Sequence, residues 1–182
     1  NGYKVDKINL ASVEAVPEDA FVVLFTNPQR DLTTAELEKL TLYMENGGNT
    51  VFLFDPLQSN TRLSNFEDFL SKFNIALGYD VVFEMAANKA AYGQPYYFMP
   101  TVENNSINAV LEPDKFNLSM LYAQSIEILK NEKEWITPTA LLTTSSEAIG
   151  RALFEGEEDN SGPLNIAVAV ENAGHVKKSK TV

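Results

Sequence analysis

Two continuous runs of apolar residues frame the clearest pattern in the chain. Residues 20–25 (AFVVLF) and 51–54 (VFLF) contain no polar position. Unbroken runs of this length are typical of parallel strands that are buried on both faces of a sheet. Between them, Leu37, Leu40 and Met44 recur at the spacing of one helical face. The pattern therefore predicts strand, helix and strand in succession, which is a βαβ unit.

Both ends of the predicted helix carry a signal of their own. Thr33 and Glu36 have the T-x-x-E spacing of a capping box, in which the hydroxyl accepts a first-turn amide and the carboxylate reaches back. Gly47 and Gly48 follow the last apolar position and predict the helix end, because glycine adopts a positive φ at little steric cost. Open parallel sheets usually bind ligands at the carboxyl ends of their strands. The polar residues that follow each strand are therefore candidates for a site.

A second helix and a third strand continue the same order. Ser64 and Glu67 have S-x-x-E spacing and predict a capped helix that runs to about Phe73. Residues 79–84 (YDVVFE) then predict a strand. The resulting β-α-β-α-β order, with short connections, predicts an α/β protein with an open, doubly wound and mostly parallel sheet.

The second half of the chain is less regular. Residues 85–117 are rich in Ala, Asn and Tyr and are interrupted by prolines, so we expect an irregular excursion with one short strand at 95–100. Further strands are predicted at 125–129, at 139–144 and, most clearly, at 164–170. We expect a single α/β domain over residues 1–174, followed by a disordered tail over 175–182. Because the chain begins at Asn1 without methionine, we expect it to be an excised part of a longer protein.

Composition removes several classes of chemistry. The chain of 182 residues has no cysteine, which excludes disulfides, thiolate nucleophiles, iron–sulfur clusters and cysteine-based zinc sites. A single histidine, His175, leaves little room for a metal site or a catalytic triad. The net charge is −11, and the only basic cluster, Lys177, Lys178 and Lys180, lies in the predicted tail, so nucleic-acid binding is not expected. No apolar run approaches the roughly 20 residues that span a bilayer. We expect no cofactor and no metal.

A set of short motifs carries a resemblance to a known family. A proline-led strand ends in Asn27-Pro28, a helix follows with Leu32-Thr33-Thr34-Ala35-Glu36, and Tyr43 precedes Gly47-Gly48. The next strand ends in Asp55-Pro56, and residues 137–151 and 161–171 also fit. With these elements in order over residues 16–171, the chain resembles the auxiliary extracytoplasmic domain of ABC-type transport systems, the gliding-motility GldG-like group.

The resemblance implies a fold, partners and a location. The fold would be flavodoxin-like, similar to that of class I glutamine amidotransferases without their catalytic residues. Partners would be the ABC permease and ATPase subunits of the same system. The protein would lie on the extracytoplasmic face of the bacterial cell membrane, anchored by flanking segments. ATP would be handled by another subunit, because no G-x-x-x-x-G-K-[ST] loop occurs in the chain.

Two groups of residues are candidates for ligand or partner contact. The polar group follows the first two strands, where the alternative explanation is turn formation, since Asx-Pro dipeptides favour turns. The aromatic group includes Tyr92 and Phe98 and could stack on sugars or anchor an interface, whereas alternation between core and surface would also explain it. The predicted contact residues are Thr26, Asn27, Gln29, Arg30, Asp31, Asp55, Tyr96 and Tyr97.

The sequence gives little support for a catalytic function. Amidotransferase chemistry needs a cysteine at a strand-to-helix elbow, and no G-x-S-x-G pentapeptide replaces it. The acidic loop over residues 155–159 lacks the D-x-D-x-D-G spacing of a calcium site. Together with these missing catalytic residues, the resemblance implies a non-enzymatic, extracytoplasmic auxiliary module that contacts proteins or envelope ligands. A domain that binds glycans or small polar ligands is one alternative, and a Ser/Thr hydrolase with His175 as its base is another.

Overall fold

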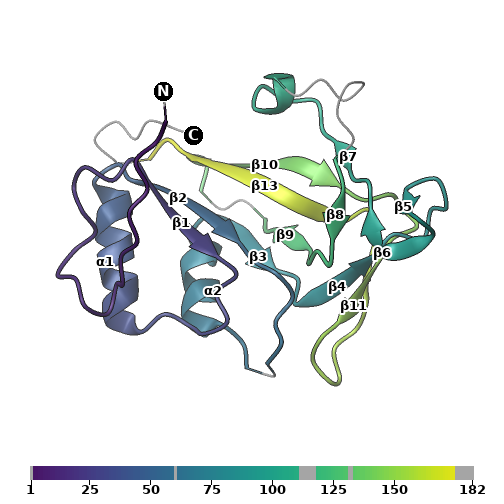
Figure 1. The fold of residues 1–182 in the computed structure, drawn as a ribbon, viewed down its shortest axis with the longest axis horizontal. Coiled ribbons are helices and arrows are strands. Elements are labelled where there is room, and N and C mark those ends of the chain that lie inside the picture. Colours follow the sequence, from purple (N-terminus) through teal and green to yellow (C-terminus); the bar gives the residue numbers. More distant parts are fainter. Residues whose placement is uncertain (1, 60, 111–117, 131–132, 175–182) are drawn as a thin grey trace.

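The computed structural model describes residues 2–59, 61–110, 118–130 and 133–174 of the chain. These residues form two α-helices, a short 3₁₀ helix and strands that assemble into four small sheets (Figure 1). The helices are α1 (Thr34–Glu45), α2 (Ser64–Ser71) and the 3₁₀ helix η1 (Asn108–Val110). The strands are β1 (Val22–Thr26), β2 (Asn49–Leu53), β3 (Ile75–Leu77), β4 (Asp80–Phe83), β5 (Ala90–Ala91), β6 (Gln94–Phe98), β7 (Thr101–Val102), β8 (Met120–Leu121), β9 (Ile126–Ile128), β10 (Ile136–Thr143), β11 (Ile149–Ala152), β12 (Asn160–Ser161) and β13 (Asn165–Asn172).

The predicted βαβ unit is present at the amino-terminal end. Strands β1 and β2 pair in parallel, with Leu24 opposite Val51 and Thr26 opposite Leu53. One face of the pair packs on the helices, where the rings of Phe25 and Phe52 stack at 5.0 Å. The ring of Phe52 also meets Phe66 of α2 edge-on at 5.9 Å. This face therefore forms the centre of the larger hydrophobic core.

Helix α1 begins and ends as the sequence predicts. Thr33 accepts the backbone N–H of Glu36 at 3.3 Å, and the Glu36 carboxylate accepts the backbone N–H of Thr33 at 2.8 Å, which completes the capping box. Gly47 has a φ of 91°. A Cβ at Gly48 would overlap the ring of Tyr43. The glycine pair thus ends the helix and leaves room for the tyrosine that the last turn buries.

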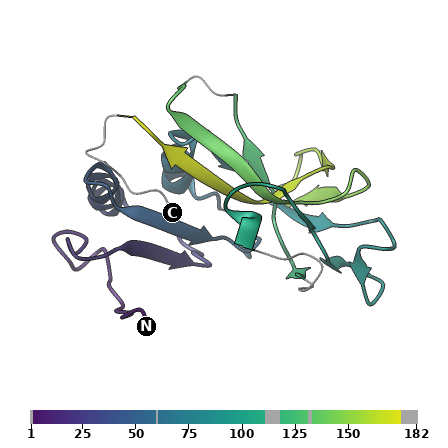
Figure 2. The same ribbon diagram turned by 90° about the horizontal axis from the view of Figure 1, so that it is seen from above.

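The remaining strands form antiparallel sheets. The largest sheet has the order β3-β9-β13-β10-β7, and its centre is the long β10–β13 pair. Two three-stranded sheets have the orders β12-β11-β4 and β5-β6-β8. Figure 2 shows α1 and α2 between the β1–β2 pair and the β10–β13 pair. A second, smaller core of Val82, Phe98, Ala123, Leu164 and Ile166 lies within this antiparallel part.

The predicted fold class is wrong. The described residues do not form an open, doubly wound, mostly parallel sheet, because β1–β2 is the only parallel pair among them. The strands predicted at 79–84, 95–100, 125–129, 139–144 and 164–170 exist as β4, β6, β9, β10 and β13, but all of them pair antiparallel and none joins β1 or β2. Periodicity located the strands, whereas the partner of each strand depends on contacts distant in sequence.

Parts of two further predictions lie outside the described residues. The predicted excursion at 85–117 contains β5, β6, β7 and η1 up to Val110, and residues 111–117 are not described. The predicted tail at 175–182, with His175 and its lysine cluster, is not described either. Within the described ranges, no helix has the length and apolar character needed to cross a membrane.

Candidate functional site

The carboxyl ends of β1 and β2 lie side by side, as the parallel pairing requires. The backbone N–H of Asn27 donates to the carbonyl of Leu53 at 2.7 Å and extends the ladder by one residue. Thr26, Asn27 and Asp55 are all exposed at this edge. The three predicted contact residues nearest to the strand ends therefore share one edge of the sheet.

The polar side chains beyond this edge are engaged in turn contacts. Gln29 donates to the side-chain oxygen of Asn27, and its own carbonyl oxygen accepts the backbone N–H of Gln58 at 3.3 Å. Asn27 has a φ of 47°, a conformation that asparagine tolerates better than most residues. The backbone carbonyl of Asp55 accepts the Gln124 side-chain amide at 3.2 Å. These contacts fix two turns, as the turn interpretation expects.

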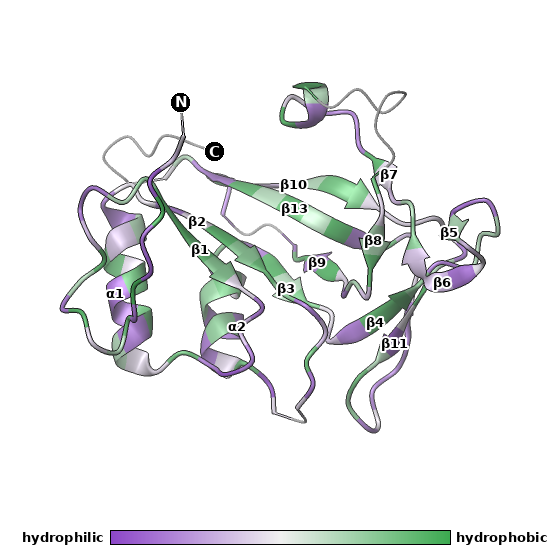
Figure 3. Ribbon diagram, in the orientation of Figure 1, coloured by the Kyte–Doolittle hydropathy of each residue, from purple (hydrophilic) through white to green (hydrophobic). Residues whose placement is uncertain are grey.

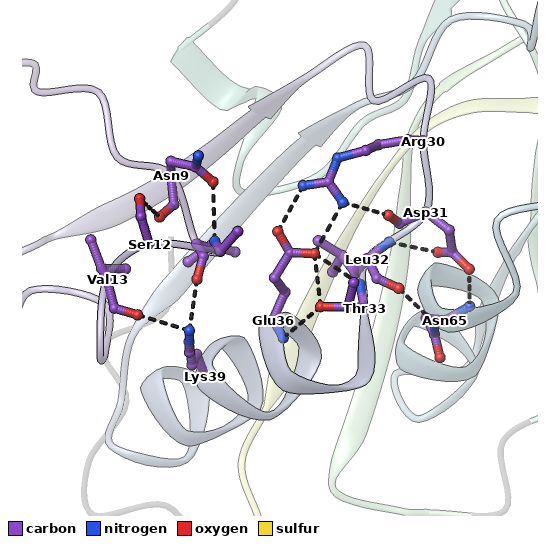
Figure 4. A network of polar contacts seen from close by, with 12 residues as sticks. Asn9, Ser12, Val13, Arg30, Asp31, Leu32, Thr33, Glu36, Lys39 and Asn65 are labelled. Carbon is purple, nitrogen blue, oxygen red and sulfur yellow. Dashed lines mark hydrogen bonds and ion pairs between the residues drawn. The ribbon is translucent and has the colours of Figure 1, made fainter.

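Arg30 is bound to the first turn of helix α1 (Figure 4). Its guanidinium donates to both carboxylate oxygens of Glu36, at 2.7 and 3.0 Å, and to the carbonyl of Asp31 at 2.9 Å. Glu36 is only 2% exposed. The bidentate bond from Arg30, followed by the backbone bond from Thr33, lowers the pKa of Glu36 from 4.5 to about 2. Arg30 therefore extends the capping box of α1 into an ion pair between a buried carboxylate and a guanidinium that is largely exposed.

Asp31 caps the other helix, α2, which is distant in sequence (Figure 4). Its carboxylate accepts the backbone N–H groups of Asn65 at 2.8 Å, Phe66 at 3.1 Å and Leu32 at 2.9 Å. The first amides of a helix lack intrahelical partners and favour negative charge. Asn65 also donates from its side chain to the carbonyl of Leu32 at 2.6 Å. The Asp31 contacts thus join the beginnings of α1 and α2.

The capping box predicted at Ser64 and Glu67 is wrong. The residue at the N-cap of α2 is Leu63, which makes no side-chain cap bond. Glu67 pairs instead with Arg62 at 3.2 Å. The helix begins one residue earlier than the motif predicts, so the Glu67 N–H, which Ser64 would have to accept, donates to the Leu63 carbonyl at 2.8 Å, while Asp31 caps Asn65 and Phe66.

The aromatic candidates lie on the small β5–β6–β8 sheet. Tyr96 and Tyr97 are consecutive in β6, and each ring stacks on a different tyrosine. Tyr96 stacks on Tyr122 with the ring centroids 4.8 Å apart and the planes 6° from parallel. Tyr97 stacks on Tyr92 at 5.8 Å and 30°. Phe98, the next residue, is fully buried in the smaller core. The structure therefore separates Tyr96 and Tyr97 from the polar group at the strand ends, because they lie on another sheet.

The two outer tyrosines combine exposure with an unfavourable backbone conformation. Tyr92 is 89% exposed and Tyr122 is 52% exposed. Their φ angles are 51° and 52°, a region that bulky residues rarely adopt. Tyr92 and Gly93, with φ 69°, form the two-residue turn between β5 and β6, where Ala91 pairs with Gln94. Tyr122 is not among the contact residues that the sequence predicts. A tyrosine–glycine pair between two strand-like runs is the one local signal that points to the hairpin.

A polar groove of about 320 Å³ lies at the junction of β3, β9 and β13. Beside it, the fully buried Asp80 carboxylate accepts the backbone N–H and the hydroxyl of Ser125, both at 2.7 Å, and the Asn160 side-chain amide at 2.9 Å. At the groove mouth, Arg62 lies over the rings of Tyr79 and Phe154, at 4.5 and 4.8 Å. A serine hydroxyl that donates to a carboxylate lacks the imidazole of a triad. The arrangement ties β4 to β12 and to the residue that precedes β9.

A second groove of about 220 Å³ lies between α1, α2 and the adjoining ends of β10 and β13. Its lining is mainly apolar and includes Met44, Phe69 and Phe73. Neither groove is lined by a predicted contact residue. Among the residues that the structure describes, no three His, Cys, Asp or Glu side chains come together as metal ligands would.

Comparisons with known proteins relate the chain to one family and one fold. A family model described as ABC-type uncharacterized transport system matches residues 1–172. No curated protein matches the chain. Four chains of solved structures do, and one of them is the mmIFT52 N-terminal domain, with 18% sequence identity and a TM-score of 0.58 over 92% of this chain and 68% of that chain. At this identity the likeness concerns the fold alone. This likeness contradicts the flavodoxin-like, amidotransferase-like fold that the resemblance implied.

Proposed function

The chain belongs to the family described as ABC-type uncharacterized transport system, and we propose that it serves such a system as a non-catalytic module that contacts other proteins. Its family makes it an auxiliary component of an ABC-type transport system. The contact partners would be the permease and ATPase subunits. Within the family, the motifs at Asn27-Pro28, Gly47-Gly48 and Asp55-Pro56 favour the GldG-like group.

The observation that carries the proposal is the pair of exposed tyrosines on the β5–β6–β8 sheet. A left-handed backbone costs a residue with a side chain about 1–2 kcal/mol, while an aromatic pair returns about 0.5–1.5 kcal/mol. The isolated fold therefore gains little from Tyr92 and Tyr122 at these positions. Buried against a partner, the ring of Tyr92, which is 89% exposed, would remove up to roughly 150–250 Å² from water, and Tyr122, which is 52% exposed, about half as much. Tyrosine is also enriched among the residues that dominate binding energy in interfaces.

The polar candidates support a role in contact over catalysis. Arg30 and Asp31 are bound to Glu36 and to the first amides of α2, and Gln29 is bound within a turn. Thr26, Asn27 and Asp55 are exposed at the strand ends themselves. These side chains offer hydrogen bonds without an activated nucleophile or a base beside them. We assign them to the margin of a partner surface.

Co-purification from cells tests the proposed contact. The full-length protein with Tyr92→Asn or Tyr122→Asn should recover at least about tenfold less permease and ATPase than the unchanged protein, as expected for hot-spot residues. Asparagine is the replacement because it tolerates a positive φ and removes only the ring. Leu42→Gln on α1, where Leu42 is 54% exposed, is the matched control and should change nothing. Equal recovery by all variants would reject the tyrosine surface.

The location is a separate part of the proposal. We assign the module to the extracytoplasmic face of the cell membrane, anchored by other segments of its protein. The absence of cysteine makes a direct test possible. A membrane-impermeant maleimide should label Glu158→Cys, in an exposed loop, on intact spheroplasts. Labelling only after lysis would place the loop on the cytoplasmic side.

A second candidate function is binding of a neutral glycan, which the exposed ring of Tyr92 favours because aromatic faces present large amphipathic contact areas. Thermal-shift measurements with neutral sugars and cell-wall fragments separate the two functions. A shift at millimolar ligand that Tyr92→Asn removes would support glycan binding. No shift, together with loss of transporter recovery in the tyrosine variants, would support protein contact.

The hydrolase alternative relies on His175 as its imidazole base. If a measured hydrolase activity survived the substitution His175→Ala, His175 would be excluded as that base.

A further inference from the structure

The polar groove at the junction of β3, β9 and β13 is large enough to hold a small molecule. Its volume of about 320 Å³ lies at the lower end of the range of about 300–1,000 Å³ that ligand sites occupy. Figure 3 shows that β4 and β13 each begin with a hydrophilic segment and continue as largely hydrophobic strands. Asn165, at the start of β13, lines the groove, and Asp80, at the start of β4, holds two residues that line it. The polar ends of two strands therefore meet at one concave surface.

Three polar side chains that line the groove use their hydrogen-bond donors within the protein. The hydroxyl of Ser125 and the side-chain amide of Asn160 donate to the carboxylate of Asp80, at 2.7 and 2.9 Å. The side-chain amide of Asn165 donates to the carbonyl of Ile126 at 3.0 Å. A carboxylate and a carbonyl only accept, so these bonds also decide which end of each amide carries the oxygen.

These side chains leave acceptors for a ligand. Each of the two asparagines retains its amide oxygen, which lies on the side of the amide away from the bound nitrogen, and Ser125 retains the lone pairs of its hydroxyl. Glu127 lines the same groove and is exposed, and its carboxylate also only accepts. The groove is therefore suited to a ligand that donates hydrogen bonds.

The charges around the groove favour a positive ligand. Among the described residues that line it, only Arg62 is basic, and its guanidinium pairs with both Glu67 and Glu157. These two carboxylates outnumber the guanidinium, and Glu127 and the buried Asp80 add two further carboxylates. Charges beyond about 8 Å are largely screened at physiological salt, so this local excess decides the sign. An anionic ligand would be repelled.

We propose that the polar groove binds an organic cation with several N–H groups, an alkylammonium or an alkylguanidinium. Glu127 pairs with its charge. The oxygens of Ser125, Asn160 and Asn165 accept its remaining N–H groups. Hydrogen bonds from a charged donor are roughly twice as strong as those between neutral groups, which favours such a cation over a neutral alcohol. The groove lies between other strands than the tyrosine pairs of the β5–β6–β8 sheet, so binding here is independent of the proposed protein contact.

Asp80 gives the groove this preference without touching the ligand. It is fully buried and accepts the donors of Ser125 and Asn160, so neither donor is left for a ligand. Gly78 leaves the space for this arrangement, because a Cβ there would overlap the Ser125 hydroxyl. Asp80 is therefore a positioning residue, which acts through the two side chains that it holds.

Titration of the 182-residue chain with matched ligands tests the site. The ligands are butylammonium, butylguanidinium, butanol and butyrate, and their binding is followed through the amide signals in NMR spectra. Each cation should bind at least about tenfold more tightly than butanol, and butyrate should not bind. The signals that move should be those of Gly78, Ser125 and the Asn165 side-chain amide. Shifts of equal size in the acidic loop at 155–159 would mean non-specific binding of cations and would overturn the proposal.

Replacement of the groove carboxylate provides the matched variant. Glu127→Gln should bind butylammonium at least about tenfold more weakly, since Glu127 is the one acidic residue among the described residues that line the groove. The fold should tolerate the change, because Glu127 is exposed on β9. Glu38→Gln, at an exposed position of α1, removes the same charge far from the groove and should leave the affinity as it is. Equal affinities of Glu127→Gln and the unchanged protein would reject the site.

Asp80→Asn tests the positioning role. An asparagine has one acceptor oxygen where the carboxylate has two, so Ser125 or Asn160 must turn a donor toward the groove. The preference for butylammonium over butanol should therefore shrink, whereas a purely structural role would lower both affinities alike. If Asp80→Asn does not fold, the comparison of Glu127→Gln with Glu38→Gln still decides whether the groove binds cations.

Acetyl-arginine amide distinguishes two sources of the cation, a free amine or guanidine and a side chain of a partner protein. It carries the guanidinium on a backbone without further charge. Binding as tight as that of butylguanidinium would assign the groove to a partner's side chain. Binding at least about tenfold weaker would assign it to a free molecule. Failure of every cation to bind at millimolar concentration would overturn the proposal, and the contact function of the tyrosines would be unaffected.

Discussion

Asp31 accepts the backbone N–H of Asn65 at 2.8 Å, although Asp31 precedes α1 and Asn65 lies 34 positions further on, in the first turn of α2. The same carboxylate accepts the N–H of Phe66, and Asn65 returns a bond from its side chain to the carbonyl of Leu32. One loop therefore caps α2 while its neighbours Arg30 and Thr33 cap α1. The two helices are fixed relative to each other at their amino-terminal ends, beneath the β1–β2 pair.

Replacement of Asp31 by alanine should destabilise the protein by about 1–2 kcal/mol, the upper range of a lost helix cap. The reason is that two amides of α2 and one of the preceding loop lose their acceptor together. Urea unfolding followed by circular dichroism measures the change. Asp19→Ala, at an exposed position before β1, controls for the loss of one carboxylate. An equal effect of the two substitutions would show that the cap contributes nothing.

The Arg30–Glu36 pair should make stability depend on pH in the acid range. The pKa of Glu36 is lowered from 4.5 to about 2, so the folded state binds its proton less readily than the unfolded state. The contribution is therefore complete above about pH 4.5 and is lost as the pH falls toward 2. Glu36→Gln should be less stable than the unchanged protein by about 1–2 kcal/mol at pH 6. This value is smaller than the shift in pKa alone would give, because the Arg30 side chain is 66% exposed and solvent screens the ion pair.

The measurement is the difference in urea midpoint between Glu36→Gln and the unchanged protein from pH 6 to pH 2. We expect this difference to shrink toward zero as Glu36 becomes protonated. Glu38→Gln, on the exposed side of the same helix, controls for the change in net charge. A difference that stays constant over the whole range would mean that Glu36 acts through its shape and that its charge is irrelevant.

The local signals in the sequence predicted helix α1 well because both of its ends are determined by adjacent residues. Thr33, Glu36 and the Gly47-Gly48 pair act within one turn of the helix, and the structure confirms each. The Ser64 box failed because the helix begins at Ser64 itself, with Leu63 at the N-cap, and its first amides are capped by Asp31, more than 30 positions away. A local motif cannot indicate that a side chain distant in sequence caps the helix in its place.

The fold class failed for a related reason. Strand-like segments such as 79–84 and 164–170 located β4 and β13, but such a pattern does not distinguish a parallel neighbour from an antiparallel one. Among the contact candidates, Arg30 and Asp31 are residue types that serve ligands and helix ends equally well. Tyr122 escaped notice because nothing local to residue 122 shows that it stacks on Tyr96.

Gly150→Ala should destabilise the β12–β11–β4 sheet. A Cβ at Gly150 would overlap the buried carboxylate of Asp80, which is already held by Ser125 and Asn160. Because these partners leave the carboxylate no room to move, we expect a loss of about 1–3 kcal/mol, as for other overpacked cores. Thermal unfolding measures it, with Gly2→Ala as control, since nothing lies within 4 Å of a Cβ there. An unchanged melting temperature would show that the Asp80 network can shift.

Substitutions at Tyr92 should separate backbone strain from ring contact. Tyr92→Asn should lower the strain of the positive φ, because asparagine tolerates this conformation better, but it removes the ring that stacks on Tyr97. Each effect is about 1 kcal/mol, so the two should nearly cancel in the free energy of unfolding. Tyr92→Val also loses the ring but keeps the strain, because a β-branched side chain fits a left-handed backbone poorly, so it should cost about 1–2 kcal/mol. Urea unfolding of the three proteins decides between these expectations. A large loss in Tyr92→Asn would mean that the ring stabilises the hairpin itself, and the argument that Tyr92 is retained for a partner would then fail.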